Sequence, residues 1–190
     1  MKTWLRALTL VLGVLALPTL AGATSLQLLP AATIVGVGDS FAIQVAISGV
    51  PADKVVGAFE VAVGYDPSLL GFQGASFGSR LGDPNNLAET ITDVNATAGL
   101  ADLAEVSLLS GTALEMLQTD GFVLATLTFQ SLALGTSSLD LSKVVIGDAE
   151  GTVIPITSLS GAVVSAVPEP AAFLTLTAGL LVLRKRLALA

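Results

Sequence analysis

Apolar residues recur at every second position through the middle of this chain. Phe41, Ile43, Val45 and Ile47 alternate with small or polar neighbours. Successive side chains of a strand point to opposite faces, so this pattern predicts a half-buried β-strand. The alternation returns at residues 59–65, 101–109 and 123–129, and further short strands are expected at residues 25–29, 70–75, 88–93, 143–146 and 159–164.

Turn-forming residues separate the expected strands. Examples are Asp66-Pro67, Gly82 to Asn86 and Gly147 to Gly151. Many short strands with such turns predict an all-β fold, a β-sandwich or jelly roll. Residues 111–117 are the one helical segment expected, and the Gly-Thr-Ser-Ser stretch at residues 135–138 is the only linker-like one.

The first 23 residues match the pattern of a secretory signal peptide. Lys2 and Arg6 precede an apolar run at residues 8–17, which Pro18 ends. Ala21 and Ala23 then place small residues three and one before a cut ahead of Thr24, so we expect residues 1–23 to be removed. The alternative, an uncleaved anchor, is disfavoured because the run is too short to span a bilayer well.

The C-terminal segment, residues 167–190, has the pattern of a membrane tail. It reads Val167, Pro168, Glu169 and Pro170, then an uncharged apolar stretch at residues 171–183, then Arg184, Lys185 and Arg186. We expect a transmembrane helix at 171–183 with the basic triplet in the cytoplasm and the domain outside. An ordinary anchor is the alternative, but this stretch covers only about 20 Å of a roughly 30 Å hydrocarbon layer, which favours a signal that is processed.

These tail residues closely resemble the PEP-CTERM sorting signal of Gram-negative bacteria in order and spacing. The resemblance implies that an exosortase, a sorting enzyme of the membrane, recognises Pro168-Glu169-Pro170. It also implies export to the cell surface or extracellular matrix, through at least a transient anchor in the inner membrane. Such systems occur in organisms that secrete exopolysaccharide.

Three phrases between the two ends resemble cohesin modules of exported bacterial proteins. They are Val37 to Phe41, Gly57 to Leu70 with its Tyr-Asp-Pro-Ser-Leu-Leu ending, and Gly121 to Phe129. Together the resemblance covers nearly all of residues 24–166. It implies a nine-stranded jelly-roll sandwich that acts by protein contact, as classical cohesins grip a calcium-loaded dockerin through one sheet face. No binding residue is carried over, because the phrases match core and turn positions.

Charge and composition exclude several functions. Residues 24–166 hold Lys54, Arg80 and Lys143 against fourteen Asp and Glu, a net charge of −11, so nucleic acid is a poor partner. The chain has no Cys and no His, which removes thiol nucleophiles, histidine bases and the usual zinc ligands. A carboxylate pair is the remaining catalytic option, but no spacing singles one out, so we expect no enzyme activity and no catalytic residues.

Two ligand hypotheses remain open. Asp148 and Glu150 lie in the Gly147 to Gly151 turn and are weak calcium candidates, although acidic residues in such a turn also suit a plain surface hairpin. Otherwise we expect no metal and no cofactor. The alternative function is binding of carbohydrate or exopolysaccharide. It is disfavoured because the domain's one Tyr, Tyr65, faces inward by alternation, and only Phe72, Phe77 and Phe122 are left to form a sugar platform.

Overall fold

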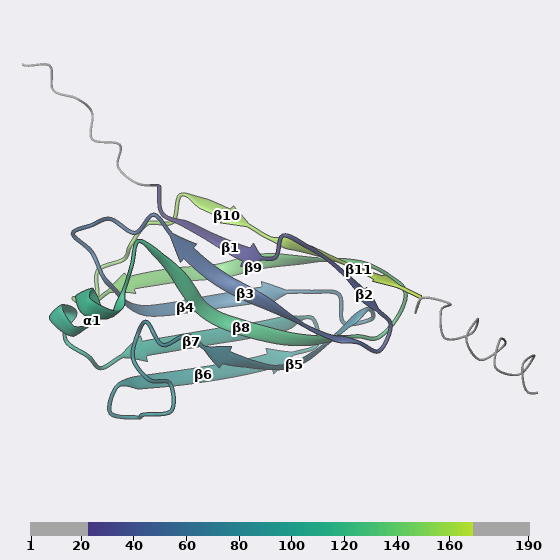
Figure 1. The fold of residues 1–190 in the computed structure, drawn as a ribbon, viewed down its shortest axis with the longest axis horizontal. Coiled ribbons are helices and arrows are strands. Elements are labelled where there is room, and N and C mark those ends of the chain that lie inside the picture. The colour runs from purple at the N-terminus through teal and green to yellow at the C-terminus, as the bar shows by residue number, and fades with distance from the viewer. Residues whose placement is uncertain (1–22, 169–190) are drawn as a thin grey trace, which may run out of the picture.

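The computed structural model describes residues 23–168, which form two β-sheets packed face to face (Figure 1). One sheet contains β1 (Ser25–Leu29), β3 (Ser40–Ser48), β5 (Leu70–Phe77), β8 (Gly121–Ser131) and β10 (Ser158–Ser160). Its strand order is β10-β1-β3-β8-β5, and we call it the five-stranded sheet. The all-β sandwich expected from the alternating sequence is thereby confirmed.

The other sheet has six strands. They are β2 (Ala32–Gly36), β4 (Val56–Gly64), β6 (Thr90–Thr97), β7 (Leu100–Ser107), β9 (Gly135–Asp148) and β11 (Ala162–Val167). Its strand order is β2-β11-β9-β4-β7-β6, and we call it the six-stranded sheet. All its pairings are antiparallel except that of β11 with β2.

The described residues contain eleven strands where nine were expected. The difference arises because the first and last strands are each interrupted and divided between the sheets. Pro30 separates β1 from β2, and Gly161 separates β10 from β11. β1 then pairs in parallel with β10 in one sheet, and β2 with β11 in the other, so the two ends of the domain lie side by side in both layers.

One local expectation was wrong, and one strand was missed. Residues 135–138, expected to be linker-like, begin the long strand β9, because Gly135 to Ser138 pair with β11. Strand β2 was not expected at all, since the Thr33-Ile34-Val35 run shows no clear alternation. The helix was placed correctly: α1 spans Gly111–Leu117 and is capped by the Ser110 hydroxyl, which accepts the Ala113 N–H.

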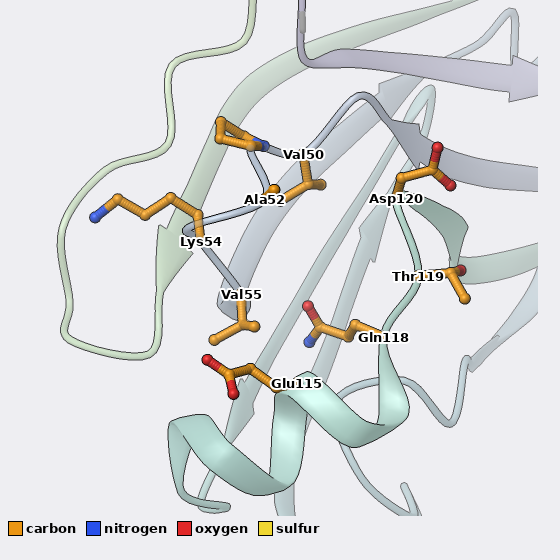
Figure 2. A pocket seen from close by; sticks show the side chains of 9 residues that line it. Val50, Ala52, Lys54, Val55, Glu115, Gln118, Thr119 and Asp120 are labelled. Atoms are coloured by element: carbon orange, nitrogen blue, oxygen red, sulfur yellow. The ribbon is translucent and has the colours of Figure 1, made fainter. Parts of the chain in front are cut away.

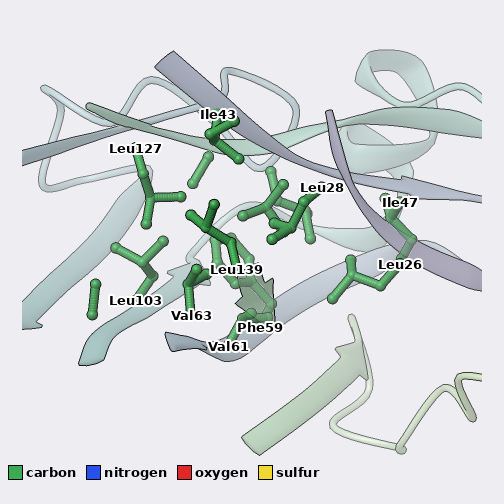
Figure 3. Packing of buried hydrophobic residues seen from close by; sticks show 14 of the residues in the cluster. Leu26, Leu28, Ile43, Ile47, Phe59, Val61, Val63, Leu103, Leu127 and Leu139 are labelled. Carbon is green, nitrogen blue, oxygen red and sulfur yellow. The ribbon is translucent and has the colours of Figure 1, made fainter. Parts of the chain in front are cut away.

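The core lies between the sheets and is built from the inward side of each alternating strand (Figure 3). Val61 and Val63 of β4 are fully buried, and Glu60 next to Val61 is exposed, as the alternation predicts. Phe129 of β8 is the largest fully buried side chain, and its ring contacts those of Phe41 and Tyr65. Within residues 23–168 no helix is both long and apolar enough to cross a membrane.

Candidate functional site

The outer faces of the two sheets differ in chemistry. No strand of the five-stranded sheet carries an Asp, Glu, Lys or Arg; its outward residues are mostly Ser, Thr, Gln and Ala. The six-stranded sheet instead presents large exposed apolar side chains beside carboxylates. Exposed apolar groups that gather on one face mark contact surfaces, so this face is the stronger candidate for binding.

An apolar row crosses four strands of the six-stranded sheet and continues to Val153, which forms a bridge with β9. Strand pairing places Ile91 opposite Val106, Val106 opposite Ala58, Ala58 opposite Gly147, and Gly147 opposite Val153. Ile91, Val106 and Val153 are 54%, 46% and 64% exposed. Four spacings between neighbouring strands make the row about 19 Å wide. Since Ala58 and Gly147 have small or no side chains, the middle of the row is low and its ends are raised.

Carboxylates border the apolar row. The next row of the same face pairs Asp93 with Ala104, Ala104 with Glu60, and Glu60 with Val145. Asp102 lies one row further, where its Oδ2 is 3.5 Å from Lys143 Nζ. We call the apolar row together with Asp93, Glu60 and Val145 the docking face. Its charged groups are both acidic, and Lys143 is the nearest basic residue along the strands.

Glu105 lies behind the docking face, on the inward side of β7. Its side chain is fully buried between Phe59 of β4 and Thr92 of β6, and neither carboxyl oxygen has a hydrogen-bond partner among the described residues. Burial without a partner raises the pKa of Glu105 to about 7. Sequence reasoning did not single out this residue, although a Glu in phase with Ala101 and Leu103 was a visible signal.

Both carboxylate oxygens of Asp148 form hydrogen bonds within the domain. Its Oδ2 accepts a bond from Lys54 Nζ at 2.5 Å, and its Oδ1 accepts the N–H groups of Glu150 and Thr152 at 3.1 and 2.7 Å. The Lys54 contact holds the pKa of Asp148 below its usual value. Glu150 is exposed. These contacts suit the plain hairpin. Among the described residues no three acidic side chains are grouped to hold a metal ion.

A hollow of about 340 Å³ lies between the loop before β4 and the end of α1 (Figure 2). The Gln118 amide beside it is held by the backbone of Val56 and Arg80. In Figure 2 the Lys54 amine points away from the hollow. The ionisable groups left are Glu115 and Asp120, which sit beside no nucleophile activated by a base, so this hollow has no arrangement suited to catalysis.

A second hollow, of about 470 Å³, has a polar lining that includes Tyr65, Asp66 and Asp140. The Tyr65 ring packs against Phe129 in a T-shaped pair with 5.2 Å between centroids, and its hydroxyl donates to Thr97 O at 3.3 Å. The three phenylalanines left for a sugar platform are not free either. Phe72 packs on Phe129, Phe77 packs on Phe59, and Phe122 is buried. The described residues therefore offer no flat exposed aromatic platform.

The expected processing sites fall at the edges of the domain. Thr24 is buried, and its hydroxyl donates to Gly49 O at 3.0 Å, whereas Ala23 is exposed. Val167 is the last residue of β11. Ala21, the Glu169-Pro170 pair, the apolar stretch 171–183 and the basic residues Arg184, Lys185 and Arg186 lie outside the described residues.

Cohesins are among the solved structures that share this fold. A cohesin of Clostridium acetobutylicum has a TM-score of 0.62 and 18% identity, covering 79% of this chain and 94% of its own. The sixth cohesin of Acetivibrio cellulolyticus scaffoldin B, solved with a mutant dockerin, has a TM-score of 0.61 and 16% identity, covering 76% and 99%. A non-cellulosomal cohesin of the archaeon Archaeoglobus fulgidus has a TM-score of 0.58 and 14% identity, covering 79% and 95%.

The family assignment comes from the sequence as well as the fold. No curated protein matches the chain. Residues 28–164, however, match the model of the cohesin domain, and this range extends from β1 into β11. The chain therefore belongs to the cohesin domain family.

Proposed function

We propose that this chain is an exported, non-catalytic module that binds a protein partner through the docking face. The observation that carries the proposal is the apolar row, which leaves Ile91, Val106 and Val153 exposed along one face of the domain. Exposed apolar side chains on a sheet cost solubility unless a partner covers them. Cohesin domains are protein-interaction modules, which agrees with this use of the sheet.

The chemistry of the docking face defines the partner. A complementary surface would place apolar side chains on the row from Ile91 to Val153 and Lys or Arg beside Glu60 and Asp93, because opposite charges at the rim speed association and exclude wrong partners. Cohesins of this fold have been solved in complexes with dockerins. We infer that the partner is a protein bearing a dockerin-like module with a basic rim.

Export and sorting belong to the same proposal. Cleavage ahead of Thr24 would leave the domain whole, because Thr24 O accepts two bonds from Thr157 and Ala23 is exposed. At the other end, Val167 completes β11 and the Pro168-Glu169-Pro170 element follows at once. Recognition of that element by an exosortase-type enzyme would act on a segment beyond the folded domain.

A capture experiment tests the proposal. In one arm the processed protein is immobilised and exposed to an envelope extract of its own host. In the other arm the processed protein in solution is passed over a column of the host's exopolysaccharide. We expect one protein to be retained, and retention to be lost after protease treatment of the extract and with Val106→Asp. Retention of polysaccharide in place of protein would contradict the proposal and support the carbohydrate alternative.

A further inference from the structure

Exposed apolar residues also gather at the end of the sandwich where the chain leaves the domain. Leu132 and Leu134 of the loop between β8 and β9 are 48% and 56% exposed, and Val167 is 38% exposed. Ala166 pairs with Gly135, so Val167 lies beside Leu134. Ile34 of the edge strand β2 is 76% exposed and pairs with Ser165. We call Ile34, Leu132, Leu134 and Val167 the exit patch.

The exit patch is held in place by backbone hydrogen bonds. Val37 N donates to Val167 O, Gly38 N to Ser131 O, and Leu132 N to Leu69 O, at 3.2, 2.8 and 2.8 Å. The first bond joins the loop after β2 to the end of β11, the second joins that loop to the end of β8, and the third joins the loop after β8 to the residue before β5. The backbone of this end is thus tied together, at the opposite end of the long axis from α1 (Figure 1).

The sequence that follows the exit patch suggests what covers it. Three residues, 168–170, separate Val167 from the apolar stretch at residues 171–183. Even fully extended, they place Val167 within about 13 Å of the start of that stretch. Two of the three are proline, whose fixed φ limits the freedom of the connection. A bilayer holding residues 171–183 would therefore lie against this end of the domain.

The charges near the exit patch define the kind of surface. Asp39 and Asp66 are exposed in the loops of this end. The domain's three basic residues lie elsewhere: Lys54 bonds Asp148 at the far end of β9, Arg80 bonds Leu117 of α1, and Lys143 lies on the face of the six-stranded sheet. Anionic lipid would be repelled here. The fit is to zwitterionic lipid, which apolar side chains can enter without a basic partner.

We propose that the exit patch is a lipid-contacting surface, in which Leu132 and Leu134 enter the interface of the outer leaflet while residues 171–183 are in the membrane. The proposal rests on the proposed export and sorting, and on the transmembrane helix that the sequence predicts at residues 171–183. Its consequence is an upright domain: the long axis stands away from the bilayer, α1 points outward, and the docking face is turned sideways toward partners.

Site-specific quenching tests this orientation. The chain has no cysteine, so a single label can be introduced at a chosen position. Ala133→Cys places it in the loop between β8 and β9, and Thr112→Cys places it at an exposed position in the first turn of α1. The full-length protein is reconstituted into phosphatidylcholine vesicles that contain lipid with a quencher in the upper acyl chain. We expect quenching at position 133 to be at least about threefold stronger than at position 112.

A loop variant separates contact from mere proximity. With Leu132→Ser and Leu134→Ser combined, quenching at position 133 should fall at least about twofold, with an unchanged thermal midpoint. Leu134→Ser alone serves if the double variant unfolds. Unchanged quenching in the folded variant, or equal quenching at both labels, would overturn the proposal. A chain that fails to float with the vesicles would overturn the membrane tail as well, so flotation distinguishes the two failures.

Discussion

Lys54 and Asp148 form an ion pair across 94 positions of the sequence, with Nζ and Oδ2 2.5 Å apart. The Asp148 side chain is fully buried, and its other oxygen organises the turn after β9 through Glu150 and Thr152. This pair therefore joins the loop before β4 to the end of the longest strand.

Removing the lysine should destabilise the domain. Lys54→Met leaves the buried Asp148 carboxylate without its cation, and an uncompensated buried charge costs more than the pair contributes. We expect a clearly lower midpoint of urea unfolding at pH 7. Lys143→Met is the matched control, since its pair with Asp102 is longer and more exposed, and its midpoint should stay close to that of the parent. Equal midpoints for the two variants would contradict this role for Lys54.

Glu105 should make the domain more stable in mild acid than at neutral pH. Its folded pKa, about 7, lies above the unfolded value of 4.5. Between pH 4.5 and 7 the unfolded chain releases this proton while the folded chain keeps it, so the free energy of unfolding falls as pH rises through that window. The flanking residues Phe59 and Thr92 do not ionise and cannot offset the effect.

The corresponding variant is Glu105→Gln. At pH 8 its free energy of unfolding, measured in urea, should exceed that of the parent by on the order of 2 to 3 kcal/mol. Most of this difference should disappear at about pH 5. Glu60→Gln, on the exposed face of the neighbouring strand, controls for the loss of one negative charge. If the free energy of unfolding of Glu105→Gln depended on pH as that of the parent does, ionisation of Glu105 would not destabilise the folded domain, which would contradict this prediction.

The register of β4 predicts opposite outcomes at neighbouring positions. Val61 is fully buried, so Val61→Asp places an unpaired carboxylate in the core and should cost several kcal/mol. Glu60 is exposed, so Glu60→Ala should change stability by no more than about 0.5 kcal/mol. Thermal melts compare the two. A Val61→Asp domain that melts like the parent would mean that the strand is shifted by one residue.

Glu169 tests the sorting hypothesis. If an exosortase reads Pro168-Glu169-Pro170, Glu169→Ala should leave the protein in the membrane fraction of a host that has the enzyme, while the parent is released or transferred. Glu150→Ala, a change of the same kind within the domain, should not alter the distribution. An identical distribution of parent and Glu169→Ala would instead support an ordinary anchor.

The fold was largely predictable because one side of each sheet packs against the core. Alternation at Phe41 to Ile47 and Phe59 to Tyr65 identified strands and their inward residues correctly. Polar strand segments escaped detection. Ser137 is buried in β9, where its hydroxyl accepts the Asp66 N–H and donates to Ser138 O. A Gly-Thr-Ser-Ser stretch forms a strand only because β11 pairs with it, and local composition does not contain that information.

The docking face could not be predicted from the sequence. Its apolar row joins Ala58, Ile91, Val106, Gly147 and Val153, which come together only through the order and register of four strands and a bridge. Alternation shows that Val106 and Ile91 lie opposite to the core side of their strands, but not that they are neighbours. The same holds for Leu134 and Val167 of the exit patch, which meet through the pairing of β9 with β11.

Binding of the captured partner to two single variants distinguishes the docking face from the outer face of the five-stranded sheet. Val106→Asp puts a charge in the apolar row, whereas Ala42→Asp puts the same charge on the exposed outer face of the five-stranded sheet. Affinities are measured by titration calorimetry on variants whose thermal midpoints match that of the parent. We predict at least about tenfold weaker binding for Val106→Asp, equivalent to about 1.4 kcal/mol, and a change within about twofold for Ala42→Asp. Weaker binding for Ala42→Asp with Val106→Asp unaffected would contradict the account, because the partner would then bind the five-stranded sheet.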